Sequence, residues 1–291
     1  MVNEDFMGLK IWLDGQLVDE KDAKVSVFDH GLLYGDGVFE GIRVYNGKIF
    51  ENVAHLKRLY DSAKVLRLSI PIDIETLQKA VEETVIANGI TDGYVRLVVT
   101  RGVGDLGLNP YLCKKASIII IAGNIQLYPE ERYEQGLRVV SVTTVRNHPL
   151  SVPPQAKSLN YLNNIFAKIE ALDANAGEAI MYNHLGYVAE ASGDNIFIVK
   201  DGVIYSPSVQ SGSLDGITRR IVIQLAEKEN LTVIEKNLTR FDLYVADEFF
   251  LTGTAAEVIG IVEIDGRKIG EGVPGPVTKL LRKKFFEYAR A

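Results

Sequence analysis

Four consecutive isoleucines at positions 118–121 constrain the fold of this chain more than any other feature. They form the centre of the segment ASIIIIAGN (116–124), which has no polar residue between Ser117 and Asn124. A short apolar run of this kind, rich in β-branched side chains, predicts a strand that is buried on both faces.

The preceding segments predict the rest of one α+β unit. Residues 9–18 (LKIWLDGQLV) indicate two strands joined by an Asp-Gly turn, and residues 93–102 indicate another strand. Residues 54–68 and 74–89 carry apolar residues at helical spacing. We therefore expect a small N-terminal domain over residues 1–122, followed by a polar, Tyr- and Glu-rich linker over residues 123–136.

A second, larger domain is expected over residues 137–291. Its pattern again alternates strands with helices, so the fold class is α+β or α/β with two domains. The predicted strands are residues 137–144, 178–183, 194–207 (two strands around Lys200-Asp201-Gly202) and 247–254, and the predicted helices are residues 160–177, 217–231 and 276–290.

Composition excludes several classes of protein. The chain has 291 residues, 47% of them hydrophobic, with a formal net charge of −6 and one cysteine. Mild acidity argues against a nucleic-acid surface, and a single cysteine excludes an intramolecular disulfide and fits a reducing, cytoplasmic location. No apolar run reaches the length of a membrane span. The four histidines are scattered and no cysteine cluster accompanies them, so we expect no metal site.

A glycine-rich motif, GVGDLG (102–107), matches the dinucleotide-binding pattern and follows a predicted strand. That pattern requires a helix immediately after the loop, so that the helix N-terminus receives the pyrophosphate. Here Pro110 follows within a few residues and blocks a helix. We interpret the segment as a flexible loop, which can form the rim of a site.

Other segments could hold an anion and a ring. The loop SGSLDGITRR (211–220) runs into a predicted helix whose N-terminal N–H groups favour an anion, although a plain helix cap is the simpler interpretation. LTGTAAEV (251–258) is a turn of small residues, and Arg58 could bind two phosphate oxygens or be a surface residue. Glu190 leads an apolar strand and needs a cationic partner, which could be a protonated pyridine nitrogen or a structural Arg or Lys. Lys157, alone in SVPPQAKSLNYLNN, is by itself most simply a solvated charge.

Taken together in this order and spacing, these motifs resemble those of the class IV pyridoxal-phosphate aminotransferases, and among them the branched-chain amino-acid aminotransferases. The resemblance covers nearly the whole chain, through YGDGVFEGIRVY (34–45), HLKRL (55–59), YVRLVVTRG (94–102), AKSLNYLNN (156–164), EASGDNIFIV (190–199), GSLDGITRR (212–220) and ADEFFLTGTAAEV (246–258). It implies a fold type IV enzyme of the D-amino-acid-aminotransferase-like fold, with pyridoxal 5'-phosphate in the cleft between the two domains. It also implies at least a homodimer, and transamination between leucine, isoleucine or valine and 2-oxoglutarate by a ping-pong mechanism.

The resemblance also implies roles for individual residues. Lys157 is similar to the catalytic lysine that bonds covalently to the cofactor, and Glu190 to the partner of the pyridine nitrogen. The remaining expected cofactor contacts are Tyr161 at the phenolic oxygen, Leu214 on the ring face, and Arg58, Ile217, Thr218 and Thr254 around the phosphate. The expected substrate contacts are Tyr34, Phe39, Tyr94, Arg96, Leu108, Tyr128, Thr254, Ala255 and Ala256. Among these, Tyr34 and Leu108 would come from the neighbouring subunit, Arg96 would meet the second carboxylate of glutamate, and the turn at 254–256 would hold the α-carboxylate.

Other readings of the same resemblance remain open at this point. A D-amino-acid aminotransferase would carry an Arg-x-His pair after YVR, and RGVGDLGLNP (101–110) has no histidine, although KSLN and GDGV occur in both groups. An (R)-amine transaminase activity and an aminodeoxychorismate lyase belong to the same fold. From a different class, a binding protein that has lost catalysis would not be expected to keep both Lys157 and Glu190.

Overall fold

The structure is a computed structural model that describes residues 8–125 and 128–291. Contacts within the chain divide it into two units, the first made of residues 1–125 and 156–160 and the second of residues 126–155 and 161–291. The sequence-based limits, at residues 122 and 137, stay predictions. The segment expected as a linker contains a short helix, α4 (Glu130–Gln135).

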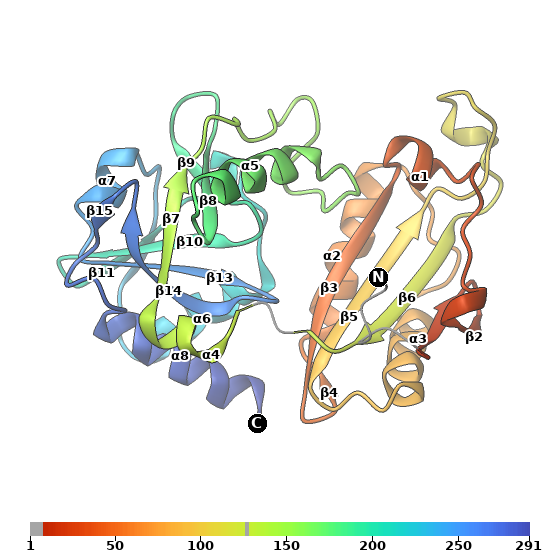
Figure 1. Cartoon of the computed structure of the whole chain (residues 1–291). Coiled ribbons are helices and arrows are strands. Elements are labelled where there is room, and N and C mark those ends of the chain that lie inside the picture. Colours follow the sequence, from red (N-terminus) through yellow and green to blue (C-terminus); the bar gives the residue numbers. More distant parts are fainter. Residues whose placement is uncertain (1–7, 126–127) are drawn as a thin grey trace. The chain divides into compact units, whose positions relative to one another are not determined.

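The first unit is a six-stranded sheet with two helices on one face (Figure 1). The strand order is β2-β1-β6-β5-β3-β4, and every neighbouring pair is antiparallel. Its elements are β1 (Lys10–Leu13), β2 (Gln16–Asp19), α1 (His30–Tyr34), β3 (Gly37–Tyr45), β4 (Lys48–Ile49), α2 (Asn52–Val65), α3 (Ile74–Ala87), β5 (Gly93–Thr100) and β6 (Ser117–Gly123), with single turns of 3₁₀ helix at Glu20–Asp22 and Pro110–Leu112. The first hairpin, the helices α2 and α3 and the strands β5 and β6 confirm the predictions for these segments.

The core of the first unit lies between the sheet and helices α2 and α3, and it corrects the prediction for the isoleucine run. Ile118 and Ile120 are buried in this core, whereas Ile119 and Ile121 are only partly buried on the opposite face of the sheet. The strand β6 therefore alternates and is not buried on both faces. The reason is that helices cover one face of this antiparallel sheet, and the opposite face carries the polar and aromatic residues described below.

Residues 156–160 belong to the first unit because they complete an open edge of β3. The short strand β4 pairs only with Val44 and Tyr45, so the first half of β3 has no strand on that side. There Phe39 N–H donates to the carbonyl of Lys157 at 3.1 Å and Leu159 N–H donates to the carbonyl of Gly37 at 2.9 Å. A segment distant in sequence thus adds a short antiparallel bridge to β3.

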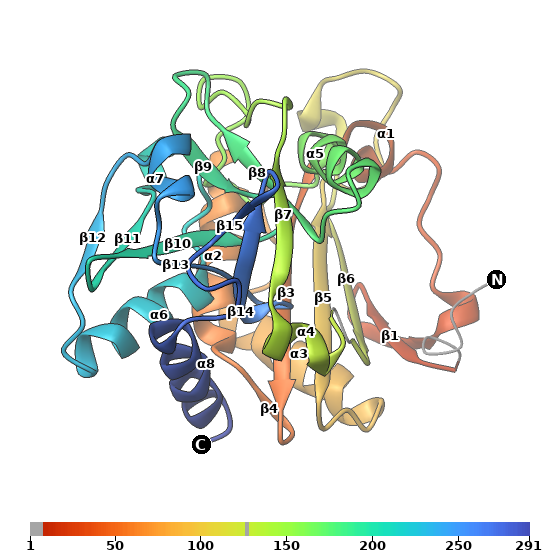
Figure 2. The same ribbon diagram turned by 60° about the vertical axis from the view of Figure 1, so that its left-hand side comes forward.

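The second unit is built on a curled sheet of nine strands (Figure 2). The strand order is β12-β11-β10-β13-β14-β7-β8-β9, with β15 paired to β14. Its elements, in addition to α4, are β7 (Leu137–Ser141), α5 (Leu162–Asp173), β8 (Glu178–Tyr182), β9 (Val188–Ala191), β10 (Asn195–Lys200), β11 (Val203–Ser206), a 3₁₀ turn (Val209–Ser211), α6 (Ile217–Lys228), β12 (Val233–Glu235), α7 (Arg240–Tyr244), β13 (Glu248–Gly253), β14 (Glu257–Ile264), β15 (Arg267–Lys268) and α8 (Pro276–Ala289).

Strands buried on both faces do occur, but in this second unit. In β8, Ile180 and Tyr182 face the main core, while Ala179 and Met181 pack against α5. In β13, Phe250 stacks on Phe197 of β10 with ring centroids 5.0 Å apart. Helices α6 and α8 pack against the same region of the sheet (Figure 2). The central strands are thereby covered on both sides.

Candidate active site

A buried carboxylate in the first unit fixes the side chain of Arg58. Glu40 of β3 is fully buried and accepts hydrogen bonds from Arg58 Nε at 2.7 Å and from Arg58 Nη2 at 2.8 Å. The second oxygen also accepts from His55 Nδ1 at 2.8 Å. Arg58 and His55 lie one helical turn apart on α2, so the sheet and the helix hold the guanidinium in one orientation.

The pKa shifts of Glu40 and His55 indicate which groups of this network are charged. Burial alone would raise the pKa of Glu40, but Arg58 and the hydrogen bonds from His55 and Arg58 lower it to about 2. Burial lowers the pKa of His55, and the positive charges of Arg58 and Lys157 act in the same direction, although Glu40 opposes them. His55 is therefore neutral near neutral pH, with its proton on Nδ1, and Glu40 and Arg58 form a buried ion pair.

Lys157 is held by its backbone on the edge of β3. Its N–H donates to the hydroxyl of Ser62 on α2 at 3.1 Å, and its carbonyl accepts from Phe39. Its Nζ lies 4.8 Å from the centre of the Phe39 ring. The electrostatic influence of Lys157 on His55 places the ammonium in the same region as Arg58.

Arg96 lies on the sheet face opposite the helices, among aromatic side chains. Its guanidinium is 4.8 Å from the Phe39 ring centre, and Nη2 donates to the Tyr94 hydroxyl at 3.3 Å. Gly41, directly opposite Arg96 on β3, makes room for this arrangement, because a Cβ there would lie 1.8 Å from the Tyr94 hydroxyl oxygen. A cation is thus held against two aromatic rings, as expected from the alternation of Tyr94 and Arg96 along β5.

Tyr34 is tied to the glycine-rich loop. Its hydroxyl, at the end of α1, donates to the carbonyl of Leu106 at 2.5 Å. Leu108 lies two residues further along this loop and is 79% exposed. The structure therefore joins Tyr34 to the loop that carries Leu108 within one chain. After GVGDLG the chain forms only a single 3₁₀ turn, so no dinucleotide-binding helix follows the motif.

Glu190 is the centre of a second set of residues, in the second unit. It is 5% exposed, and one oxygen accepts from Arg146 Nε at 3.0 Å and forms an ion pair with Nη2 at 2.7 Å. Arg146 also donates to the side-chain oxygens of Asn163 and Asn164 at the start of α5. The structural arginine that the sequence left open as a partner of Glu190 is therefore present.

The other oxygen of Glu190 faces the loop before α6. It accepts from the backbone N–H of Leu214 at 2.9 Å, and Asn195 Nδ2 lies 3.4 Å away. Asn195 also donates to the Leu214 carbonyl at 2.9 Å. The same asparagine lies against Gly216, where a Cβ would approach its side-chain oxygen to 2.0 Å. Glu190 and the Leu214 loop are therefore fixed to each other.

Two sets of backbone N–H groups flank this loop. Helix α6 begins at Ile217, and its N-cap is Gly216, which has no side chain to satisfy the first N–H groups. Thr218 is buried in the first turn of the helix. The turn of Thr254, Ala255 and Ala256 follows β13, and Thr252 near its start pairs with Asn195. A helix start with unsatisfied N–H groups favours an anion.

Two further candidate tyrosines lie in the second unit. Tyr128 packs against its core, and burial, together with the charges of Asp194 and Glu178, raises the pKa of its hydroxyl. Tyr161 is the N-cap residue of α5. The structure thus groups the candidates into two sets: Tyr34, Phe39, Arg58, Tyr94, Arg96, Leu108 and Lys157 in the first unit, and Tyr128, Tyr161, Glu190, Leu214, Ile217, Thr218, Thr254, Ala255 and Ala256 in the second.

Sequence reasoning missed four residues that fix the candidates in place. They are Glu40 and His55 beside Arg58, Arg146 beside Glu190, and Asn195 beside Leu214. The carboxylate of Glu40 between apolar residues in VFEGIR (38–43) was an available signal, because such a carboxylate needs a partner if it is buried. Arg146 lies in an irregular segment and no spacing in the sequence points to Glu190.

The fold is that of a class IV aminotransferase. The family model described as Amino-transferase class IV matches residues 37–264, and the chain belongs to this family. A relative from Methanocaldococcus jannaschii, named provisionally as a branched-chain-amino-acid aminotransferase, is 53% identical over 278 residues, which are 95% of each chain. The branched-chain-amino-acid aminotransferase of Pseudomonas aeruginosa is 43% identical and covers 95% of this chain and 92% of its own.

A solved structure extends the similarity to the whole fold. The branched-chain amino acid aminotransferase of Thermobaculum terrenum, in its PLP-form (holo-form), has a TM-score of 0.89 and 29% identity, and the match covers 98% of this chain and 96% of that one. The predicted fold type IV is confirmed.

Neither a membrane-spanning helix nor a metal cluster is found among residues 8–125 and 128–291. None of the helices there is both long and apolar enough to cross a membrane. That part of the chain also has no group of three or more His, Cys, Asp or Glu side chains that could hold a metal ion.

Proposed function

We propose that this protein transfers amino groups reversibly between leucine, isoleucine or valine and 2-oxoglutarate, with pyridoxal 5'-phosphate as cofactor. The observation that carries the proposal is the buried Glu190, fixed by Arg146 and the Leu214 N–H beside the open start of α6. The carboxylate suits the pyridine nitrogen of the cofactor, and the anion-binding start of α6 suits its phosphate group. The names of the relatives, at 53% and 43% identity, supply the branched-chain substrates.

The residues present fit this cofactor. Its phosphate would be held by the N–H groups of Ile217, Thr218 and Thr254 and by Arg58, whose guanidinium is already oriented by Glu40. Glu190 would bind the ring nitrogen, Tyr161 the phenolic oxygen and Leu214 the ring face. When bound, the cofactor draws electrons from the substrate α-carbon.

Lys157 would act on the reacting atoms in two ways. Its amine would hold the cofactor covalently in the absence of substrate, and when free it would be the base that accepts the proton from the substrate α-carbon. The backbone bonds to Phe39 and Ser62 fix the start of the side chain, which orients the amine.

Arg96 and its aromatic neighbours would receive the substrate side chain. The rings of Phe39 and Tyr94 offer apolar surface to a branched side chain, while Arg96 can pair with the second carboxylate of glutamate. Tyr34, Leu108 and Tyr128 would complete the apolar walls. Backbone N–H groups of Thr254, Ala255 and Ala256 would hold the α-carboxylate, which every substrate shares.

We further infer that the protein works as a homodimer or larger homo-oligomer. Helix α1, the segment before it and the segment from Val103 to Leu112 expose several large apolar side chains, which in a monomer would contact water: Val27, Phe28, Leu32, Tyr34, Val103, Leu106, Leu108, Tyr111 and Leu112. Exposed apolar side chains in this number favour a protein partner. Tyr34 and Leu108 are among them, so a second copy could supply both to its neighbour's substrate pocket. The single cysteine supports a cytoplasmic location.

A panel of substrates tests the proposal. The purified holoenzyme should convert L-glutamate and the 2-oxo acids of leucine, isoleucine and valine to the branched-chain L-amino acids. D-glutamate and (R)-1-phenylethylamine serve as alternative donors, and chiral chromatography identifies the product. Faster turnover with either alternative donor, or a D-amino-acid product, would contradict the proposal.

A further inference from the structure

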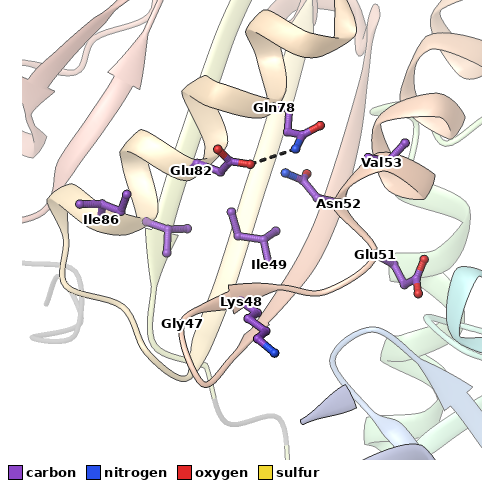
Figure 3. A pocket seen from close by; sticks show the side chains of 10 residues that line it. Gly47, Lys48, Ile49, Glu51, Asn52, Val53, Gln78, Glu82 and Ile86 are labelled. Atoms are coloured by element: carbon purple, nitrogen blue, oxygen red, sulfur yellow. Dashed lines mark hydrogen bonds between the residues drawn. The ribbon is translucent and has the colours of Figure 1, made fainter. Parts of the chain in front are cut away.

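A second cavity lies in the first unit and shares no residue with the candidate active site. It has a volume of about 600 Å³ and is formed by the β3–β4 turn, the start of α2 and one side of α3 (Figure 3). This volume is in the range of cavities that bind small molecules. Its polar centre is Asn52 with Gln78 and Glu82, and its apolar walls include Ile49, Val85 and Ile86.

Asn52 is the residue that points to a ligand. Its side chain is only 7% exposed, and within the described part of the chain neither its amide nitrogen nor its amide oxygen has a hydrogen-bond partner. Buried amides in folded proteins almost always have partners, because burying an unsatisfied donor and acceptor is unfavourable. Figure 3 shows the amide of Asn52 turned toward Gln78 and Glu82 of the neighbouring helix.

Glu82 supplies a negative charge beside this amide. One of its oxygens accepts from Gln78 Nε2 at 3.0 Å, one helical turn away on α3. Among residues 8–125 and 128–291 no cation forms an ion pair with Glu82, and a carboxylate can accept several hydrogen bonds. An ammonium group is the ligand chemistry that Glu82 and the Asn52 oxygen would bind together.

The start of α2 favours a ligand group of the opposite charge, an anion, at the same cavity. Its N-cap residue, Glu51, has a left-handed backbone, and within the described structure its side chain does not cap the helix. Figure 3 shows the side chains of Glu51 and Lys48 pointing away from Asn52. The first N–H groups of α2, at Asn52 and Val53, therefore favour an anion, and the Asn52 amide nitrogen can donate to the same group.

We propose that this cavity binds a free aliphatic α-amino acid. Its ammonium group pairs with Glu82, its carboxylate lies at the start of α2 beside the Asn52 amide, and its side chain packs on Ile49, Val85 and Ile86. The proposal does not depend on the transamination chemistry, because none of these residues belongs to either set of the candidate active site.

Methyl NMR of the holoenzyme, labelled with ¹³C at the isoleucine δ1 methyl groups, tests the site. L-leucine is the probe, and without a 2-oxo acid acceptor each active site can convert only one equivalent. Signals of Ile49 and Ile86 should shift with leucine and saturate. The matched analogues 3-methylbutylamine, which lacks the carboxylate, and 4-methylpentanoate, which lacks the ammonium, should bind at least about tenfold more weakly, because each loses one charge-assisted contact.

Two variants on α3 provide a matched comparison. Glu82→Gln should weaken leucine binding at the Ile49 and Ile86 signals by about tenfold or more, while Glu83→Gln, the next residue and exposed, should leave it unchanged. Asn52→Leu, which fills the same space without polar atoms, should abolish the shifts and leave the thermal melting temperature without leucine unchanged or raised. No shift with leucine, equal binding of the amine alone, or equal affinity in Glu82→Gln and Glu83→Gln would overturn the proposal.

Discussion

Replacing Glu40 by glutamine would test whether the buried ion pair behind Arg58 stabilises the first unit. The change removes one negative charge and leaves Arg58, which is itself buried, without its counter-charge. The pKa of Glu40 falls from 4.5 to about 2 in the folded protein. At about 1.4 kcal/mol for each pH unit, this corresponds to about 3 kcal/mol of folding free energy. Removing one partner of a buried ion pair typically lowers the free energy of unfolding by about 3–5 kcal/mol, in agreement with this value.

The only tryptophan of the chain offers a direct assay. Trp12 is 7% exposed and belongs to the core of the first unit, so its fluorescence during urea unfolding reports on that unit. Glu40→Gln should lower the free energy of unfolding by about 3 kcal/mol at neutral pH. Glu75→Gln, an exposed carboxylate in the first turn of α3, is the matched control and should change it by less than about 0.5 kcal/mol.

The pH dependence separates this charge effect from a packing defect. Because the folded pKa of Glu40 is depressed, its contribution is fully present above pH 4.5 and is lost as the pH falls from there toward about 2. The difference between wild type and Glu40→Gln should therefore shrink over that window. His55 adds a separate effect, since its pKa is lowered and the unfolded chain takes up its proton first as the pH falls below 6.5. A difference below about 1 kcal/mol at neutral pH, or one that stays constant in acid, would refute the reasoning.

Three other predictions concern the proposed reaction. Lys157→Ala should lose the visible absorption of the bound cofactor and nearly all turnover, and borohydride treatment of the wild type should attach the cofactor to the Lys157 peptide; mass spectrometry that finds it on another lysine would contradict the assignment. Glu190→Gln should slow the single-turnover reaction of leucine by about a hundredfold or more, and a near-normal rate would remove this residue from the mechanism. Adding Arg146→Met to Glu190→Gln should restore the stability of the protein without restoring the rate. Arg96→Ala should reduce catalytic efficiency about ten- to a hundredfold more with glutamate than with leucine in single-turnover half-reactions, because a charge-assisted contact contributes about 1.5–3 kcal/mol. Gly41→Ala, whose Cβ would collide with the Tyr94 hydroxyl at 1.8 Å, should produce the same selective loss, and equal losses for both substrates would argue against the role of Arg96.

Periodicity in the sequence predicted the regular elements well where apolar residues repeat without interruption. The helices α2, α3, α5, α6 and α8 and the strands β5, β8, β10 and β13 lie where expected, within a few residues. The long strand β3 was not predicted, because GVFEGIRVY contains two glycines and two charges that break the alternation. The charge of Glu40 is satisfied by Arg58 and His55 of helix α2, which a local pattern does not contain.

The candidate site could be predicted only in part for a related reason. Motif resemblance pointed to Lys157, Glu190 and Arg58, but not to the residues that hold them. Arg146 meets Glu190 across 44 positions of sequence, and Ser62 meets Lys157 across 95. Such contacts arise from the topology of the sheets, and a single sequence carries no periodic signal for them.

The placement of residues 156–160 in the first unit has a consequence for how the protein is made. The chain leaves the first unit at residue 125, begins the second, and returns to the first before the second is finished. During translation the open edge of β3 therefore stays unpaired until Lys157 and its neighbours have left the ribosome, and an unpaired edge is prone to join other chains. A fragment that stops at residue 125 would keep that edge uncovered, whereas one that extends through residue 160 would cover it. The same five residues, 156–160, thus complete the edge of the first unit and also contain Lys157, so the edge and the lysine are put in place together during synthesis.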